Sequence, residues 1–242
     1  MCGANRPRKE SDMASDVFRD RREAGQELGR RLLPVCAGRD VRVLALPRGG
    51  VPVGYEVALA LHAPLDVMVV RKLGIPGHPE YAMGAIASGG MRLVNDAVVR
   101  ELGISSAAIE EVVRAERIEL ERREHRYRDG RPPPDVRGRT VVLVDDGLAT
   151  GATMRVAVRA LRALQPARIV VAVPVAAGDT CESLRSEADE VLCARTPRAF
   201  HAVGQWYQDF SQTSDEEVGA LLNQSARETA SPSWRTRGRA SA

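Results

Sequence analysis

Two adjacent acids followed by a loop of small residues carry the clearest chemical signal in the sequence. Asp145 and Asp146 come directly after four apolar residues, and a short loop then leads to Gly151 and Thr153. A loop that opens a helix leaves backbone N–H groups free at the positive end of the helix dipole, where an anion such as phosphate binds. Glycine at position 151 removes the Cβ that would keep the anion away from the backbone.

The two acids need a different partner, because carboxylates repel a phosphate group. Sugar hydroxyls and a divalent cation are the groups that fit them. The sequence therefore predicts a phosphorylated sugar bound together with Mg²⁺. A plain strand, turn and capped helix without a ligand is disfavoured, since paired acids that end a buried strand are costly to desolvate.

Other phosphate-binding and catalytic motifs are missing from the sequence. It contains no G-x-x-x-x-G-K-[ST], no G-x-G-x-x-G and no G-x-S-x-G. A P-loop NTPase, a dinucleotide-binding Rossmann enzyme and an α/β-hydrolase are therefore disfavoured.

Residues 141–154 closely resemble the phosphoribosyl-pyrophosphate (PRPP) motif of type I phosphoribosyltransferases, in which four apolar residues, two acids and a T-G-x-T loop follow one another. The resemblance implies that Asp145 and Asp146 hold the ribose hydroxyls and, partly through the ligand, the metal. It also implies that the 5′-phosphate is bound by the loop residues Ala149, Thr150, Gly151, Ala152 and Thr153. The whole layout is most similar to bacterial phosphoribosyltransferase-domain proteins without an assigned substrate.

A second loop, with Arg48, Gly49 and Gly50, follows the first apolar strand of the core. It stands where the family has its pyrophosphate loop. A guanidinium can make two parallel hydrogen bonds to phosphate oxygens, and the glycines expose backbone N–H groups to the same anion. An ordinary strand-to-helix turn is the alternative.

Arg71 and Lys72 begin a third segment, similar to the lid of adenine phosphoribosyltransferase but without its second lysine. The resemblance implies that both cations act with Arg48 on the leaving pyrophosphate. Because glycines and prolines punctuate residues 71–81, the sequence predicts a mobile loop without regular structure there. A solvated Arg–Lys pair is the alternative.

Residues 200–210 loosely resemble the segment of hypoxanthine-guanine phosphoribosyltransferase that stacks on the purine and supplies a metal-associated aspartate. The resemblance assigns Phe200 and Tyr207 to the nucleobase and Asp209 to the metal. Core packing is an equally good interpretation of these aromatic residues.

Alternating strand-like and helix-like segments predict an α/β fold, with a parallel sheet flanked by helices and its ligand site at the carboxyl ends of the strands. Strands are expected at 41–46, 65–70, 141–144, 169–173 and 191–193, and a hairpin at 82–94. The phosphoribosyltransferase domain is expected to span residues 15–222. It includes a cap insert at about 71–138, with the long charged helix 106–127, and the hood also uses residues 195–210. The polar segments 1–14 and 223–242 are predicted to be disordered tails.

Composition limits the class of protein. Of 242 residues, 44% are hydrophobic and 28% charged, with a net charge of +3, which is typical of a globular domain. No apolar run is long enough for a membrane span or a signal segment, so a cytoplasmic protein without a membrane partner is expected. Acids and bases are interspersed, which disfavours nucleic acid as a partner. The four cysteines form no C-x-x-C pair, so neither a zinc cluster nor a disulfide framework is expected.

The family resemblance implies an enzyme of nucleotide metabolism that moves the 5-phosphoribosyl group of PRPP to a nucleobase-like nitrogen and releases pyrophosphate, with Mg²⁺ as cofactor. A non-catalytic protein that senses PRPP or a nucleotide is the alternative. The identity of the acceptor is not encoded in any motif, and an oligomer is possible.

Overall fold

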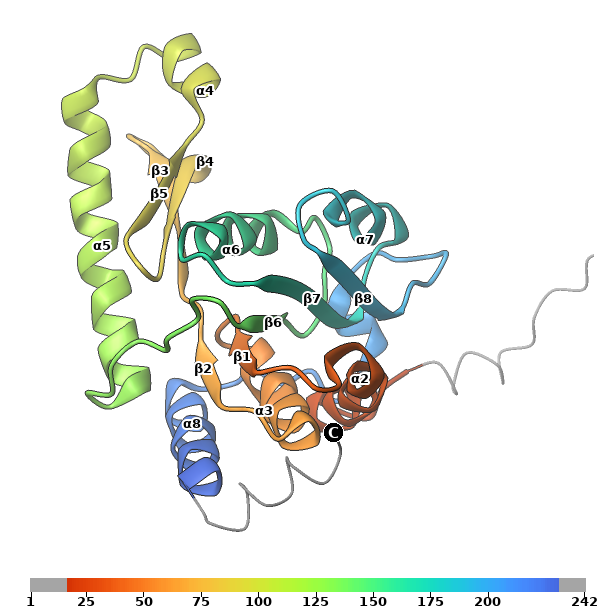
Figure 1. Ribbon diagram of the computed structural model, residues 1–242. Coiled ribbons are helices and arrows are strands. Elements are labelled where there is room, and N and C mark those ends of the chain that lie inside the picture. The colour runs from red at the N-terminus through yellow and green to blue at the C-terminus, as the bar shows by residue number, and fades with distance from the viewer. Residues whose placement is uncertain (1–16, 231–242) are drawn as a thin grey trace, which may run out of the picture.

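The computed structural model describes residues 17–230, so the predicted tail 1–14 lies outside the described residues. Five parallel strands form the central sheet in the order β2-β1-β6-β7-β8 (Figure 1). Their bounds are β1 Val41–Ala45, β2 Leu65–Val67, β6 Thr140–Val144, β7 Arg168–Val175 and β8 Glu190–Arg195. The predicted parallel α/β sheet is therefore confirmed.

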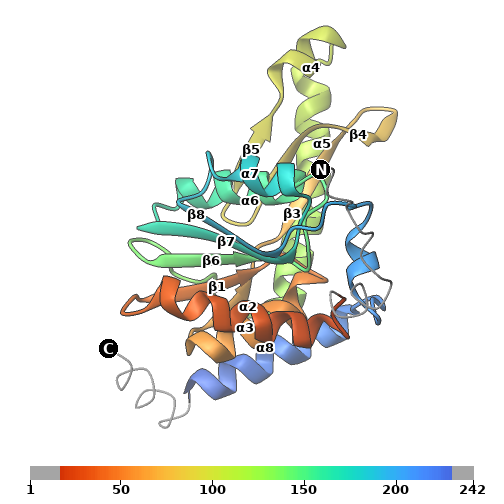
Figure 2. The same ribbon diagram turned by 90° about the vertical axis from the view of Figure 1, so that its right-hand side faces the viewer.

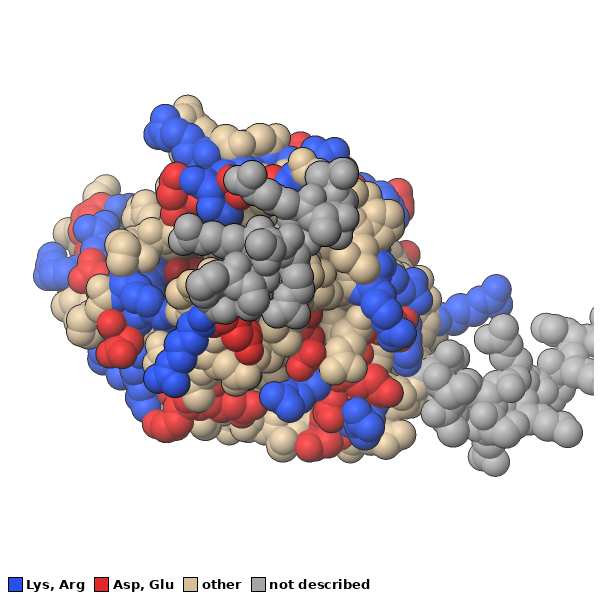
Figure 3. Space-filling view, turned by 60° about the horizontal axis from the view of Figure 1, so that its bottom comes forward, with Lys and Arg blue, Asp and Glu red and all other residues tan. Residues whose placement is uncertain are grey.

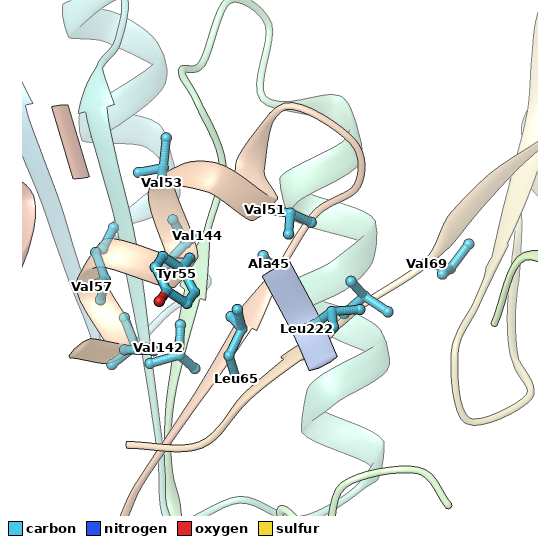
Figure 4. Packing of buried hydrophobic residues seen from close by; sticks show 14 of the residues in the cluster. Ala45, Val51, Val53, Tyr55, Val57, Leu65, Val69, Val142, Val144 and Leu222 are labelled. Carbon is cyan, nitrogen blue, oxygen red and sulfur yellow. The ribbon is translucent and has the colours of Figure 1, made fainter. Parts of the chain in front are cut away.

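Helices cover both faces of this sheet (Figure 2). The helices on one side are α2 (Arg21–Cys36), α3 (Gly50–Leu61) and α8 (Asp215–Ala230), and those on the other are α6 (Ala152–Ala163) and α7 (Gly178–Leu184). Strand β6 serves both cores: Val142 and Val144 pack among the residues of Figure 4, whereas Val141 and Leu143 pack against α6 and α7. Burial on both faces explains its uniformly apolar sequence.

A cap stands away from the central sheet (Figure 1). It consists of an antiparallel sheet, β3 (Val70–Ile75), β4 (His78–Ala87) and β5 (Met91–Val94), with helices α4 (Asp96–Glu101) and α5 (Ser106–Arg128). The expected hairpin at 82–94 is confirmed as β4 and β5. The prediction of an irregular loop at 71–81 was wrong, since most of it belongs to β3 and β4.

Residues 71–81 form strands because their glycines lie at positions where a hairpin needs them. Gly77 has φ +83° in the turn between β3 and β4, and the pairing of the two strands shifts its register at Gly74. Glycine therefore supplies a turn and a bulge in a continuous ladder instead of interrupting it.

The C-terminal tail was predicted to begin too early in the chain. Helix α8 continues to Ala230, so residues 223–230 are helical, and only 231–242 fall outside the described residues. The Ser214 hydroxyl accepts a hydrogen bond from the N–H of Glu217 at the start of the helix. Val218 and Leu222 are buried against the core, and the Tyr55 hydroxyl of α3 donates to Glu228. An apolar face packed on α3 stabilises a segment whose composition is polar.

The cysteines give a further correction. Cys181 of α7 and Cys193 of β8 form a disulfide, and Cys36 is a buried free thiol. The pair is separated by 12 residues in sequence, so no short motif signals it, but packing of α7 beside β8 brings the two Cα atoms within 6.5 Å.

Helix hydropathy and surface charge bear on the expected partners. Across residues 17–230, no helix is both long and apolar enough to cross a membrane. On the face shown in Figure 3, blue and red side chains are intermixed and do not separate into patches of one sign.

A buried arginine joins the cap to the central sheet. Arg128, in the last turn of α5, is 4% exposed. Its guanidinium donates to the Asp66 carboxylate (2.8 Å) and to the Val67 carbonyl (2.9 Å) of β2, and also to Glu124 (2.8 Å). Burial raises the pKa of Asp66, and the charge of Arg128 opposes that shift. This buried cation therefore helps to hold the cap on the central sheet, together with the buried side chains of Leu120 and Tyr127.

We predict that Arg128→Met lowers the free energy of unfolding by about 3–5 kcal/mol, because it leaves Asp66 buried without its counter-charge. Arg122→Met on the same helix is the matched control. Arg122 is exposed, and among residues 17–230 its ion pair is with Glu119 one turn away, so its loss should cost less than about 1 kcal/mol. Urea unfolding of both variants checks this, and equal losses would contradict it.

Candidate functional site

The strand order brings the two predicted anion loops together. Strands β1 and β6 are neighbours, and the N–H of Leu46 donates to the Val144 carbonyl (2.8 Å) just before each strand gives way to its loop. A Cβ added to Gly49 would overlap the Asp146 carboxylate, and one added to Gly50 would lie 2.9 Å from the Val144 carbonyl oxygen. Only glycine allows this contact. The peptide bond between Pro47 and Arg48 is cis.

The predicted phosphate cradle, residues 149–153, is largely exposed and is held from one side. Leu148 forms an isolated parallel bridge with Ala176, and the Thr180 hydroxyl donates to the Ala149 carbonyl (2.6 Å). Gly151, at φ +71°, caps α6 without a side chain. The remaining predicted cradle residues, Ala149, Thr150, Ala152 and Thr153, are all exposed. The first turn of α6 therefore faces solvent with backbone N–H groups and two hydroxyls, which suits an anion.

The acid pair between these loops is desolvated. Burial, together with the neighbouring charge of Asp146, raises the pKa of Asp145 well above its usual value. The N–H of Asp146 donates to Asp145 Oδ1 (2.9 Å) and opposes that shift. Burial also raises the pKa of Asp146, against the effect of Arg21. Two carboxylates held in this way favour any ligand that brings hydroxyl donors or a cation to them.

Arg21 is a site residue that no sequence motif predicted. Its Nε donates to Asp146 Oδ2 (2.9 Å), and both side chains are largely buried. Another guanidinium nitrogen donates to the Ser211 carbonyl (2.7 Å), and the group lies 4.0 Å from the centre of the Phe210 ring. Arg21 is 125 residues from Asp146 in sequence. The only local signal at this position is the helix start at Asp20, which does not point to the arginine.

Tyr207 supports the acid pair from the core. Its hydroxyl donates to the Asp146 carbonyl (2.5 Å), and its ring packs between Phe18 and Phe210, with centroids 5.6 and 5.1 Å away. It is 5% exposed, and burial raises the pKa of its hydroxyl. Of the two interpretations left open for the aromatic residues, core packing fits Tyr207. Phe200 is half-buried against the same cluster.

The three predicted cations lie on different elements and differ in their partners and exposure. Arg48 is partly exposed and lies 3.9 Å from Asp215 of α8. Arg71 donates to Glu116 of α5 (2.7 Å), so its guanidinium is held by the cap helix. Lys72 is exposed on β3.

Asp209, the expected third metal-associated acid, is exposed and accepts a hydrogen bond from the N–H of Ser211, which lowers its pKa. It lines a pocket with Asp20, Arg21 and residues of α8. Within residues 17–230 no group of three His, Cys, Asp or Glu side chains is arranged to hold a metal ion.

A parallel α/β sheet with a cap, an anion cradle and an acid pair at its strand ends defines the type I phosphoribosyltransferase fold. Residues 34–209 match the family model of the phosphoribosyl transferase domain, and the chain belongs to that family.

Individual relatives agree with this assignment. Two Mycobacterium tuberculosis proteins, from strains CDC 1551 and H37Rv and provisionally named phosphoribosyl transferases, are each 50% identical over 214 residues, or 88% of this chain. The chain spans about half of their length (48%). The crystal structure of TT1426 from Thermus thermophilus is 44% identical, with a TM-score of 0.75 over 86% of this chain and 98% of that one.

We predict that Asp145→Asn stabilises the ligand-free protein at pH 7 by about 0.5–2 kcal/mol, as is common when a substitution relieves an unfavourable functional site. Folding raises the pKa of Asp145, so the wild-type protein loses stability as the pH rises from the unfolded value through the folded one. The asparagine variant avoids this loss, and its Oδ1 can still accept the N–H of Asp146.

The gain should shrink as the pH falls towards about 4, where the wild-type carboxyl is protonated. Urea unfolding between about pH 4.5 and 8 measures the difference, with Glu121→Gln on the exposed side of α5 as a control that should show little change. A variant no more stable than wild type at pH 7 would show that Asp145 carries no such penalty.

We further predict strong coupling between Arg21 and Asp146 in a double-mutant cycle. Arg21→Met should cost about 3 kcal/mol because it strands a buried carboxylate, whereas adding Asp146→Asn should recover part of that loss. The exposed pair Arg185–Glu182 is the control, with an expected coupling below about 1 kcal/mol. Additive effects at Arg21 and Asp146 would mean that the ion pair does not organise the site.

Proposed function

We propose that this protein binds PRPP with Mg²⁺ and transfers its 5-phosphoribosyl group to a nucleobase-like nitrogen acceptor, releasing pyrophosphate. The observation that carries the proposal is the contact between the Gly49–Gly50 loop and the Asp145–Asp146 turn. This contact sets an acid pair, which suits sugar hydroxyls, between two glycine-containing loops that suit anions. PRPP has its hydroxyls between a phosphate and a pyrophosphate, in the same order.

Each part of the ligand has a candidate partner. The cradle at 149–153 would bind the 5′-phosphate through the first-turn amides of α6 and the hydroxyls of Thr150 and Thr153. Asp145 and Asp146 would accept hydrogen bonds from the ribose hydroxyls, which also relieves their desolvation. Arg48 would bind the pyrophosphate, and Gly49 and Gly50 let the anion approach the backbone.

The acid pair fits Mg²⁺ brought by the ligand better than a resident metal. Mg²⁺ usually keeps several waters and takes only one or two carboxylates together with substrate phosphates. Asp145 and Asp146 supply such a pair, partly through the bound ribose, and Asp209 remains a proposed outer partner. When bound, the ion would neutralise charge that develops on the departing pyrophosphate.

The chain's own residues would then act on a bond whose cleavage leaves positive charge on the ribose and negative charge on the pyrophosphate. Arg48 stabilises the leaving group, and the acid pair fixes the ribose for attack by the acceptor nitrogen. Arg71 and Lys72 would add charge only if Arg71 exchanges Glu116 for a pyrophosphate oxygen. That exchange would draw β3 and β4 over the site and exclude water.

The acceptor would meet the aromatic residues that follow β8. Phe200 is half-buried near the site, so it is the better of the two proposed aromatic contacts for a base, whereas Tyr207 acts through Asp146. A nucleobase-like acceptor fits an enzyme of nucleotide metabolism in the cytoplasm. The match covers about half (48%) of each mycobacterial relative. The function proposed here is therefore that of the phosphoribosyltransferase domain.

A sensor of PRPP or a nucleotide is the second candidate. Two observations favour it. The ion pair with Glu116 occupies the Arg71 guanidinium, and the ring of Tyr207 packs in the core, where it cannot stack on a base. Such a protein would use the cradle and the acid pair but would not break the bond to pyrophosphate.

One experiment separates these candidates. The full chain is incubated with PRPP, Mg²⁺ and a panel of nucleobases, and pyrophosphate release is measured beside PRPP binding by calorimetry. Release that depends on one base supports the transferase, whereas binding without release supports the sensor. Asp145→Asn combined with Asp146→Asn should abolish PRPP binding while the circular dichroism of the fold is unchanged. Full PRPP affinity in that variant would contradict both functions.

We predict that Thr150→Val weakens every 5′-phosphorylated ligand by a similar factor. A hydrogen bond to a charged group is worth about 1.5–3 kcal/mol, which corresponds to roughly 10- to 150-fold in Kd. Calorimetry with PRPP and with ribose 5-phosphate tests this, and Thr229→Val on α8 is the control because its hydroxyl donates to the Ser225 and Ala226 carbonyls of its own helix. A loss confined to one ligand would argue against a phosphate contact.

A further inference from the structure

The Cys181–Cys193 disulfide lies beside the wall of the phosphate cradle. Cys181 follows Thr180, whose hydroxyl donates to the Ala149 carbonyl of the cradle (2.6 Å). The Thr180 methyl group also packs on the glycine that caps α6: a Cβ added to Gly151 would lie 2.8 Å from it. Thr180 therefore contacts the cradle through both branches of its side chain.

The backbone around α7 continues this wall. The N–H of Ala177 donates to the Leu148 carbonyl (3.0 Å), and the N–H of Cys181 donates to the Ala177 carbonyl (3.0 Å). The side chain of Leu184, which is fully buried, would lie 3.7 Å from the same added Cβ on Gly151. Movement of α7 would therefore shift the support of the cradle directly.

Helix α7 depends on its surroundings for this rigidity. It has only seven residues, too few for a stable helix by itself. The disulfide ties its centre to β8, which is the edge strand of the central sheet. Arg155 of α6 adds hydrogen bonds to Ser183 and Glu187, so α7 keeps some polar anchoring without the covalent bond.

We propose that Cys181 and Cys193 form a thiol–disulfide switch that sets the rigidity of the phosphate cradle. The disulfide holds α7 against Ala149 and Gly151, and reduction loosens that support. In a reducing compartment, disulfides are usually transient and redox-sensing. The consequence for PRPP affinity rests on the proposed function, whereas the change in cradle rigidity does not.

The chemistry is exchange with a low-molecular-weight disulfide, RSSR. Cys193 is half-buried and Cys181 is 5% exposed, so the Cys193 thiolate is the accessible nucleophile. It attacks RSSR, forming a mixed disulfide and expelling one RS⁻, which takes up a proton. The Cys181 thiolate then attacks the Cys193 sulfur and expels the second. Two protein thiols lose two electrons and two protons, and RSSR becomes two RSH; an excess of thiol reverses both steps.

The test uses a full chain with Cys2→Ser and Cys36→Ser, in which positions 181 and 193 hold the only cysteines. It is equilibrated in reduced or oxidised glutathione, an acyclic RSSR couple, and thiol titration with mass spectrometry reports the disulfide. Hydrogen exchange of the amides at 148–153 reports the cradle, with amides of α5 as an internal reference. Calorimetry measures PRPP affinity with Mg²⁺ in both states.

Reduction should speed exchange at 148–153 by about fivefold or more and weaken PRPP binding by a similar factor, the lower range of coupling between linked sites. Exchange in α5 should not change, and reoxidation should restore the cradle. Cys193→Ser in the same background should match the reduced state under both conditions. The redox comparison uses one chain, so it does not depend on that variant folding.

Two results would overturn the switch: no disulfide under oxidising conditions, or a disulfide whose reduction leaves exchange at 148–153 unchanged. Failure of PRPP to bind either state would refute the proposed function instead. Hydrogen exchange is measured without ligand. The exchange rates at 148–153 therefore test the switch even if PRPP does not bind.

Discussion

Two carboxylates at the end of a buried strand are the constraint on which the rest of this protein depends. Strand β6 is apolar on both faces, and it delivers Asp145 and Asp146 to a position where burial raises the pKa of each. Such a pair is unfavourable by itself, so its neighbours are arranged around it. Glycines at 49 and 50 allow the adjoining loop to approach, and Arg21 and Tyr207 bond to Asp146 from elements distant in sequence.

We therefore expect stability and the proposed ligand binding to oppose each other at the acid pair. The same desolvation that destabilises the ligand-free protein strengthens the interaction of the carboxylates with any hydroxyl or cation that reaches them. The phosphate cradle differs from the acid pair in kind. Its residues are uncharged and all but Gly151 are exposed, the proposed ligands for an anion are backbone N–H groups, and α7 holds the loop from outside. The acid pair is therefore limited by the cost of burying charge, whereas the cradle depends on the packing of α7 against it.

Two charged contacts of the cap helix α5 differ in burial and in the element that they reach. Arg128 is buried where α5 of the cap meets β2 of the central sheet, whereas Arg71 of β3 is paired with Glu116 of α5 inside the cap. The first contact is desolvated and holds the base of the cap. The second is partly exposed, so a polyanion could compete for Arg71 at much lower cost. The fold thus combines a rigid attachment with a cation that a ligand could recruit.

The sequence by itself determined the parts of the site that are contiguous. Strand β6, the acid pair, Gly151 and the start of α6 follow one another within 14 residues, and local backbone rules are enough to predict their arrangement. Only the tertiary structure decided the rest. The pairing of Arg21 with Asp146, the burial of Tyr207 and the Cys181–Cys193 bond each join elements that no local pattern relates. The hairpin at 70–87 and the last turns of α8 were missed because pairing between the two strands and packing of the helix outweigh the local preferences of glycine, proline and polar residues.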